Sequence, residues 1–468
     1  MIQDKLVPFL RENGRKIARI SIPVLLEHSS MTLMNVVSTA LATSLGSVAV
    51  SALGLVHTVN LALLLAINAL AVGGTVAVAR AFGRQDRVGI GKAAIQSIVS
   101  ITMIGLAVTL LVWVTRVPLV NWLYGAADPE VLEATHVMYR LYTLSIPLWA
   151  YISIASGVLR GVGDTRTTFF VSIATSLTNL LFTYVFIRGL RLDLGFLEID
   201  YAGVGYRGPA LGMLVARVIG AVAVTVPLLR SRRKEGMNAI RMGALRRYRP
   251  DRRTLSEIYR IAVPASVEQL IFEIGKIITS TIIVGLGTAS LAANTIAWSV
   301  LSMFNLPGAS AMTSTTTLAG QAIGEGDRGK TRSTLLVMTG LIMAIYVLLS
   351  LLLLAFMKPL IGMYGAAPDV VPIVRTLLLS LLVPMTLFWP AGYIVAAGLR
   401  AAGDVKHVML VAIVSMWTMR VGGAYLLVKV ADMGILGLWI SMYADWVFRV
   451  AFFGKRIFGD RWFARSGI

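Results

Sequence analysis

Two glutamates stand in apolar stretches of the chain where a charge is costly, and each begins a polar stripe at helical spacing. The first stripe consists of Glu27, Met31, Asn35 and Ser38. The second lies 241 positions later and consists of Glu268, Phe272, Lys276 and Thr279. Spacings of i, i+4, i+8 and i+11 place each set on one helix face. A carboxylate in a membrane needs a partner or a cavity, so these residues are candidates for binding protons, cations or cationic substrates.

Glu273 adds a second acid to the later stripe, and Lys276 follows it at i+3, within reach of its carboxylate. Two interpretations remain open: a static pair that only neutralises two buried charges, or an acid that is alternately protonated, ion-bound or substrate-bound. Burial raises the pKa of such an acid and a neighbouring lysine lowers it, so the acid can be set to exchange one cation for another. The only metal ion we consider is Na⁺ near Glu273, because Cys is absent and the 4 His are scattered.

The elements that carry these residues belong to an internal repeat. Ile20-Ser21-Ile22-Pro23 returns as Ile261-Ala262-Val263-Pro264, and at the same offset of 241 the residue Gly46 meets Gly287 and Asp86 meets Asp327. Duplicated halves in a membrane protein usually surround a central site, which is the architecture of a transporter.

The composition is that of an all-α polytopic membrane protein. The chain is 57% hydrophobic and 14% charged, and its mean hydropathy is +0.78, whereas soluble domains carry about 25% charged residues. We expect about twelve transmembrane helices in two pseudo-symmetric lobes of six. Their approximate ranges are 17–42, 48–79, 93–115, 134–158, 168–189, 209–230, 258–284, 290–320, 333–356, 374–398, 407–428 and 434–453.

The distribution of Lys and Arg predicts the orientation. Alternate connections and the two ends, counted from Arg449 at the C-terminal end, hold 32 basic residues on one side against 8 on the other. This split places both termini in the cytoplasm. The predicted organisation is an N-lobe (1–229), a basic cytoplasmic linker (230–257) and a C-lobe (258–468). Basic loops beside a bilayer attract anionic lipid, so the net charge of +20 does not indicate nucleic-acid binding.

Two motifs close the fourth and tenth predicted helices. They are Gly157-Val158-Leu159-Arg160-Gly161-Val162-Gly163-Asp164-Thr165-Arg166 and Gly398-Leu399-Arg400-Ala401-Ala402-Gly403-Asp404. The pair resembles the signature of the MATE (multidrug and toxic compound extrusion) family. The resemblance implies a monomeric secondary transporter in the bacterial inner membrane that exports cationic amphipathic compounds in exchange for H⁺ or Na⁺, with no other cofactor. We expect Arg160 and Arg400 to act as helix C-terminal caps.

Comparison with the family also shows departures. The spacing Glu268-x4-Glu273-Ile274-Gly275 resembles the paired acids of H⁺-coupled members, and Phe272-Glu273-Ile274 resembles the acidic motif of Na⁺-coupled members. Many members carry acids where this chain has Ser38, Thr183 and Trp389, although Asn179 is kept. We favour H⁺ as the coupling ion, because too few carboxylates remain in the N-lobe to assemble a dehydrated Na⁺ shell there. Glu27 is either a substitute for the missing acids or a structural residue that pairs with His28 or a helix terminus.

Other polar residues fall within predicted spans. Arg420 and Asp445 are expected to pair with each other, and Arg217 either lines the cavity or extends toward the membrane surface. The absence of a Walker pattern indicates that an ion gradient supplies the energy. The alternative function is a lipid or lipid-linked oligosaccharide flippase of the same superfamily. No nucleophile or metal-ligand spacing supports an enzyme.

Overall fold

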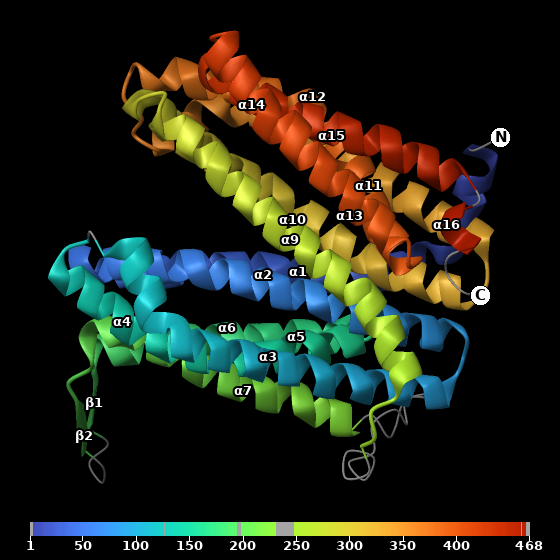
Figure 1. The fold of residues 1–468 in the computed structure, drawn as a ribbon, viewed down its shortest axis with the longest axis horizontal. Helices are drawn as coiled ribbons and strands as arrows, with labels where there is room; N and C mark the ends of the chain where they lie inside the picture. Colours follow the sequence, from blue (N-terminus) through green and yellow to red (C-terminus); the bar gives the residue numbers. More distant parts are fainter. Residues whose placement is uncertain (1–2, 126, 194–197, 231–247, 460, 465–468) are drawn as a thin grey trace. The chain divides into compact units, whose positions relative to one another are not determined.

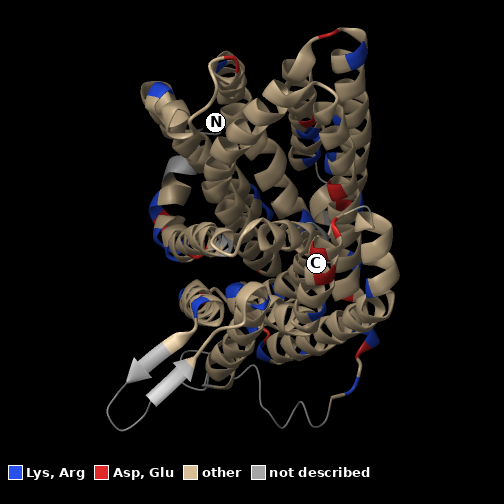
Figure 2. Ribbon diagram, turned by 90° about the vertical axis from the view of Figure 1, so that its left-hand side faces the viewer, with Lys and Arg blue, Asp and Glu red and all other residues tan. Residues whose placement is uncertain are grey.

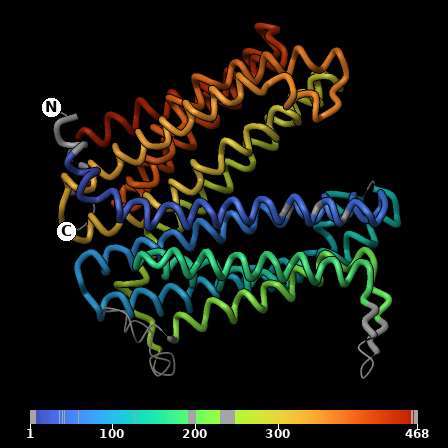
Figure 3. Tube along the Cα trace, turned by 180° about the vertical axis from the view of Figure 1, so that it is seen from behind, coloured from blue at the N-terminus to red at the C-terminus, as the bar shows by residue number. Residues whose placement is uncertain are grey.

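The protein is described by a computed structural model covering residues 3–125, 127–193, 198–230, 248–459 and 461–464 (Figure 1). The described chain is predominantly α-helical, as predicted, and it forms two compact units. The N-terminal unit contains Leu26–Ala262, and the C-terminal unit contains Met1–Leu25 together with Val263–Ile468. Within each unit the long helices run side by side (Figures 1 and 3).

The N-terminal unit contains the part of α1 from Leu26 onward and the helices that follow it. Their bounds are α1 (Gln3–Thr43), α2 (Ser47–Gly83), α3 (Arg87–Tyr124), α4 (Pro129–Leu144), α5 (Ile146–Gly161), α6 (Thr165–Arg188), the 3₁₀ turn η1 (Gly205–Arg207) and α7 (Gly208–Arg230). A core of small and β-branched side chains joins α2, α3 and α5, and it includes Val78, Ala94 and Ile154. Small residues let these helix backbones approach closely.

The C-terminal unit contains most of α9 and the remaining helices. Their bounds are α9 (Arg252–Val284), α10 (Thr288–Gly324), α11 (Arg328–Met363), α12 (Val370–Ala401), α13 (Val405–Ser415), η2 (Met416–Gly422), α14 (Gly423–Tyr425), η3 (Leu426–Val430), α15 (Gly434–Phe458) and α16 (Arg461–Ala464). The core of this unit is richer in large side chains, which include Tyr346, Trp389 and Trp439. Helices α10, α11 and α12 pack together around it.

Helices α1 and α9 each contain a boundary between the units. The boundaries follow Leu25 and Ala262, close to the repeated Pro23 and Pro264. The predicted N-lobe, 1–229, included residues 1–25, but the structure groups them with the C-terminal unit. The predicted linker, 230–257, lies largely outside the described residues, because 231–247 are not described.

The internal repeat is visible in the backbone. Gly46 and Gly287 precede α2 and α10 with φ of 89° and 90°, a region that side chains with a Cβ rarely adopt. The side chains of Asp86 and Asp327 accept hydrogen bonds from backbone N–H groups three residues later, which caps α3 and α11. Equivalent residues of the two halves therefore perform the same local task.

Helices cover all twelve predicted spans, two of which are built from consecutive shorter elements. Ten of the described helical segments are long and apolar enough to cross a membrane. The other two are α9, with 33 residues, and α10, with 37 residues. They are long enough to cross a membrane but do not contain a sufficiently apolar stretch. Figure 2 shows that most of each helix is neither acidic nor basic. The chain is therefore a multi-pass membrane protein.

Three local features depart from regular helices. The connection between the predicted spans 168–189 and 209–230 contains β1 (Leu190–Asp193) and β2 (Glu198–Tyr201), paired antiparallel with Leu190 opposite Tyr201. Ser145 separates α4 from α5, with Pro147 in the first turn of α5. The elements η2 and η3 are π-helical, a widened geometry that often occurs at functional sites.

Candidate functional site

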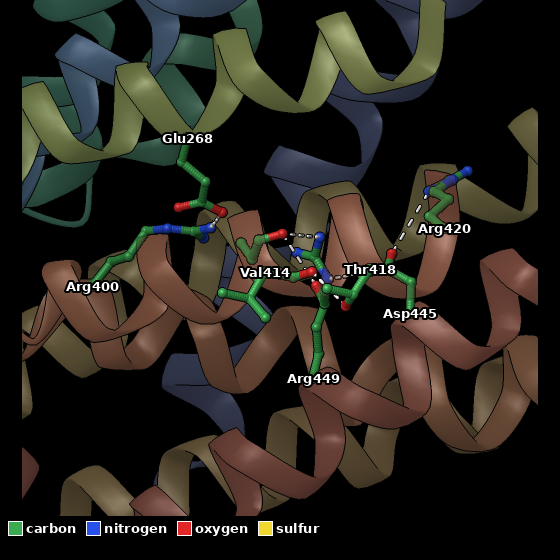
Figure 4. A network of polar contacts seen from close by, with 9 residues as sticks. Glu268, Arg400, Val414, Thr418, Arg420, Asp445 and Arg449 are labelled. Carbon is green, nitrogen blue, oxygen red and sulfur yellow. Dashed lines mark hydrogen bonds and ion pairs between the residues drawn. The ribbon is translucent and has the colours of Figure 1, made fainter. Parts of the chain in front are cut away.

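The acids of the two polar stripes each meet an arginine of the same unit. Glu27 Oε1 accepts a hydrogen bond from Arg160 Nη1 at 3.0 Å, and Glu27 Oε2 accepts one from Thr168 Oγ1 at 3.1 Å. Glu268 Oε1 accepts from Arg400 Nη2 at 2.5 Å (Figure 4). Both glutamates are buried, with 8% and 7% of their surface exposed. Each unit therefore contains a buried glutamate–arginine pair of this kind.

These pairs correct the expected role of the motif arginines. Arg160 and Arg400 lie in the last turns of α5 and α12, where a cap was expected. Their guanidinium groups instead reach the carboxylates of α1 and α9. For Glu27, the structure shows an arginine and a threonine as partners, so a structural role fits its geometry. Among the described residues, Glu268 Oε2 has no hydrogen-bond donor.

Glu273 and Lys276 form the predicted contact on α9. Lys276 Nζ donates to Glu273 Oε1 at 3.0 Å and to Oε2 at 2.8 Å, and Gln269 Nε2 also donates to Oε1 at 3.0 Å. The side chain of Lys276 is 38% exposed and that of Glu273 is 15% exposed. Unlike the two buried glutamate–arginine pairs, this pair has one partly exposed member, Lys276.

Asp445 of α15 is shared by two arginines (Figure 4). Arg449 Nε donates to Asp445 Oδ1 at 2.9 Å, and Arg420 Nη1 lies 3.8 Å from Asp445 Oδ2. The expected Arg420–Asp445 pair is thus present, but at 3.8 Å it is an ion pair without a hydrogen bond. Arg449, expected among the basic residues of the C-terminal end, is buried and is the closer partner. The sequence signal for this contact was the i+4 spacing of Arg449 from Asp445 in an apolar helix, which places the two side chains on one face.

The ring of Phe272 connects these groups. Arg449 Cζ, Arg420 Cζ and Lys276 Nζ lie 5.4, 5.5 and 6.0 Å from its centroid. A cation near a ring face is stabilised by the ring quadrupole. We call the described charged residues around Phe272 the C-terminal charge cluster: Glu268, Glu273, Lys276, Arg400, Arg420, Asp445 and Arg449. Its four cations face three carboxylates, so the cluster carries one positive charge in excess.

The other predicted site residues do not join this cluster through the contacts that the structure describes. Thr279 Oγ1 donates to the backbone oxygen of Lys276 in its own helix. Asn179 of α6 accepts from Thr183 Oγ1 at 3.3 Å. Ser38 Oγ is buried without a hydrogen-bond partner among the described residues, and the side chain of Asn35 lies outside the described residues.

Arg217 of α7 lies in the N-terminal unit, where it is 3% exposed. Its Nη1 donates to Ser145 Oγ at 2.6 Å, and its Cζ lies 5.2 Å from the centroid of the Trp149 ring. The side chain thus does not extend toward the membrane surface. No group of three or more His, Cys, Asp or Glu suited to a metal ion occurs within the described parts of the chain.

Outside the spans, Asp251 caps the start of α9. Thr254 donates to its Oδ2 through the hydroxyl at 2.5 Å and the backbone N–H at 2.9 Å, and Lys92 Nζ lies 3.0 Å away. These contacts lower the pKa of the Asp251 carboxyl from 3.8 to about 2, with the Thr254 hydrogen bonds as the largest cause.

Comparison with known proteins agrees with the repeat and the fold. The MatE family model matches residues 23–185 and again 264–426, two segments at the offset of 241 seen in the sequence. The chain belongs to the MatE family. This MatE protein is 25% identical over 443 residues to a probable multidrug resistance protein NorM of Thermotoga maritima, covering 95% of this chain and 91% of the relative. It is 27% identical over 430 residues to the uncharacterized transporter YisQ of Bacillus subtilis, covering 91% and 90%.

Solved structures share the fold of this MatE chain. A crystal structure of MATE in the bent conformation has a TM-score of 0.85 and 23% identity, covering 99% of both chains. A MOP superfamily transporter from Pyrococcus furiosus, described as having a binding pocket of reverse polarity, has a TM-score of 0.83 and 24% identity, covering 97% and 98%. The two-lobe helical transporter fold predicted from the repeat is therefore the fold of this chain.

Proposed function

We propose that this MatE protein is a secondary active exporter that exchanges cationic amphipathic small molecules for H⁺ or Na⁺. Relatives named multidrug resistance proteins support export of drug-like compounds. In this proposal the two lobes alternate access to the two sides of a bacterial inner membrane, the protein acts as a monomer, and both termini lie in the cytoplasm.

The observation that carries the proposal is the accessible Glu273–Lys276 pair. An exchange site needs a carboxylate that can leave its resident partner when another cation arrives. Arginine holds a carboxylate with a rigid planar fork, whereas lysine is a flexible, strongly hydrated point charge. Arg160 and Arg400 are 17% and 15% exposed against 38% for Lys276. We therefore assign exchange to Glu273 and positioning to Glu27 and Glu268.

The proposed mechanism is competition for one carboxylate. A cationic compound displaces Lys276 from Glu273 and places its positive group near the Phe272 ring, where cation–π attraction contributes. An incoming proton or sodium ion then neutralises Glu273 and releases the compound. Obligatory exchange follows because the Glu273 carboxylate binds either the cationic compound or the coupling ion, and not both at once. We favour H⁺, because the acid retained in the N-terminal unit, Glu27, is occupied by Arg160 and Thr168.

The test is ethidium efflux in proteoliposomes under an imposed pH gradient or an imposed Na⁺ gradient. Glu273→Gln should abolish gradient-driven efflux. Glu325→Gln is the matched control, because Glu325 also pairs with a lysine, Lys330, but lies between α10 and α11. Wild-type efflux in Glu273→Gln would remove this acid from the mechanism, and efflux under neither gradient would reject antiport.

The flippase remains a second candidate because of one observation: the C-terminal charge cluster has a positive charge in excess. Transfer of a lipid with an acidic headgroup would use that excess. Exchange of a fluorescent phospholipid between leaflets of protein-containing vesicles tests this function. Lipid transfer that stops in Arg420→Gln would favour the flippase over the exporter.

A further inference from the structure

Two other arginines of the N-terminal unit, Arg80 and Arg160, lie next to a carboxylate, and Arg217 differs from them in this respect. Arg160 meets Glu27 at 3.0 Å, and Arg80 lies 3.5 Å from Glu257. Within the described residues, Arg217 has no carboxylate within 4.0 Å, and its Nε has no hydrogen-bond acceptor. One buried positive charge of this unit is therefore not neutralised by the described chain.

Ser145 does not neutralise Arg217. Its hydroxyl accepts from Arg217 Nη1 at 2.6 Å, while its own hydrogen is donated to the backbone oxygen of Tyr142 at 2.6 Å. Trp149 stands against the guanidinium, and its Nε1 also has no acceptor among the described residues. Two neighbouring N–H donors are thus left without acceptors.

The position of Arg217 makes this arrangement costly. It lies nine residues after Gly208 in a helix of 23 residues, so it is roughly 14 Å from the start of α7. From that depth an arginine near the middle of a span does not easily reach the membrane surface. An unpaired arginine at the centre of a bilayer is unfavourable, and such residues usually have a functional partner. A bound anion would supply the missing negative charge and would accept hydrogen bonds from Arg217 Nε and Trp149 Nε1.

We propose that Arg217 and Trp149 form a binding site for the acidic group, a carboxylate or a phosphate, of an amphipathic compound. The guanidinium provides charge-assisted hydrogen bonds to the acidic oxygens, Trp149 Nε1 provides another, and the indole ring covers the adjoining apolar part. The compounds handled by the protein then include acid-bearing and zwitterionic molecules. Binding is independent of the proposed antiport; only the transport of such compounds rests on it.

The experiment measures binding of carboxyfluorescein by fluorescence anisotropy to the purified full chain in phosphatidylcholine nanodiscs. Arg217→Gln should weaken its affinity by about tenfold or more, the loss expected for a charge-assisted hydrogen bond. Arg217→Lys, which keeps the charge, should retain part of the affinity. Ethidium, the cationic probe, should bind each variant within about twofold of the wild type.

Arg116→Gln is the matched control. Arg116 also stacks on a tryptophan of the same unit, Trp113, with its Cζ 4.4 Å from the ring centroid, but it already donates to the backbone oxygen of Trp113. Carboxyfluorescein binding should be unchanged in this variant. Equal affinity of wild type and Arg217→Gln for carboxyfluorescein would overturn the proposal, as would an equal loss of carboxyfluorescein and ethidium binding.

A second measurement separates a binding role from a structural one. If Arg217 lacks an internal acid, Arg217→Gln should unfold at the same temperature as the wild type or higher in the absence of ligand. A marked decrease would show that Arg217 holds the fold through a resident partner, which contradicts the proposal. Anion binding that depends on Arg217, in a protein without gradient-driven ethidium efflux, would keep this site and reject only the exporter.

A lipid headgroup is the other source of the same chemistry. In nanodiscs containing phosphatidylglycerol, weaker carboxyfluorescein binding by the wild type but not by Arg217→Gln would identify the headgroup as an occupant. The same weakening in both proteins would place the headgroup away from Arg217 and would contradict a lipid occupant.

Discussion

Arg400 donates to Glu268 across α12 and α9, and Arg160 donates to Glu27 across α5 and α1 in the other half. The glutamates are 241 positions apart and the arginines 240. The repeat has therefore preserved both partners of a long-range ion pair. In each unit this pair joins the helix that carries the polar stripe to the helix that ends in the family motif.

Removal of one partner of this pair should destabilise the protein strongly. Arg400→Met leaves the buried Glu268 carboxylate unpaired, which costs about 3–5 kcal/mol. The double variant Arg400→Met with Glu268→Met should cost less than either single change. Guanidinium unfolding of the four proteins in detergent micelles, as a double-mutant cycle, measures the coupling. Strictly additive costs would show that the two side chains do not depend on each other.

The two arginines that share Asp445 should differ in their contribution to stability. Arg449→Gln removes the hydrogen bond of 2.9 Å and should cost about 3 kcal/mol. Arg420→Gln removes an ion pair of 3.8 Å and should cost about 1 kcal/mol or less. Thermal unfolding of both variants gives the order. A larger loss for Arg420→Gln would reverse the assignment of Arg449 as the main partner.

Removal of Lys276 should increase cation affinity if the lysine competes for Glu273. We expect Lys276→Ala to bind ethidium about tenfold more tightly, equivalent to about 1.4 kcal/mol. Lys330→Ala, which removes the lysine partner of Glu325, is the matched control and should leave binding unchanged. Fluorescence titration of ethidium checks both variants, and weaker binding by Lys276→Ala would argue for a static pair.

Asp251 should make a stabilising contribution that disappears in acid. Its folded pKa of about 2 is below the ordinary 3.8, so the folded state favours the carboxylate. This stability is fully present above the unfolded pKa and is lost as the pH falls from about 4 through about 2. At neutral pH the wild type should unfold at a higher temperature than Asp251→Asn, and the difference should vanish near pH 2. Scanning fluorimetry at several pH values measures this difference, and a pH-independent gap would contradict it.

Much of the helical architecture could be predicted from the sequence because length and apolar content are local properties. The predicted span 93–115 became α3, Arg87–Tyr124, which extends farther at both ends. Helical hydrogen bonds continue into the polar membrane surface, whereas hydropathy declines there. The π-helical geometry of η2 and η3 was not predicted, because it changes backbone hydrogen bonding without altering the apolar pattern.

The candidate site was only partly predictable. Glu273 and Lys276 are three residues apart, so their contact followed from helical geometry. The pairing of Glu268 with Arg400 depends on how α9 packs on α12, which residues 132 positions apart do not reveal by spacing. The burial of Arg449 had a signal in its i+4 spacing from Asp445, but its position near the C-terminal end suggested a surface charge.

The grouping of residues 1–25 with the C-terminal unit has a consequence for biosynthesis. Ile17 and Ile20 belong to the same hydrophobic core as Val374 and Trp439, and a ribosome adds roughly 5–20 residues per second. The segment that contains Ile17 and Ile20 must therefore wait roughly 18–70 s after its own synthesis before Val374 is added to the chain. A chaperone or the insertion machinery would have to shield that segment during the delay, and a truncated translation product would leave it without a place to fold.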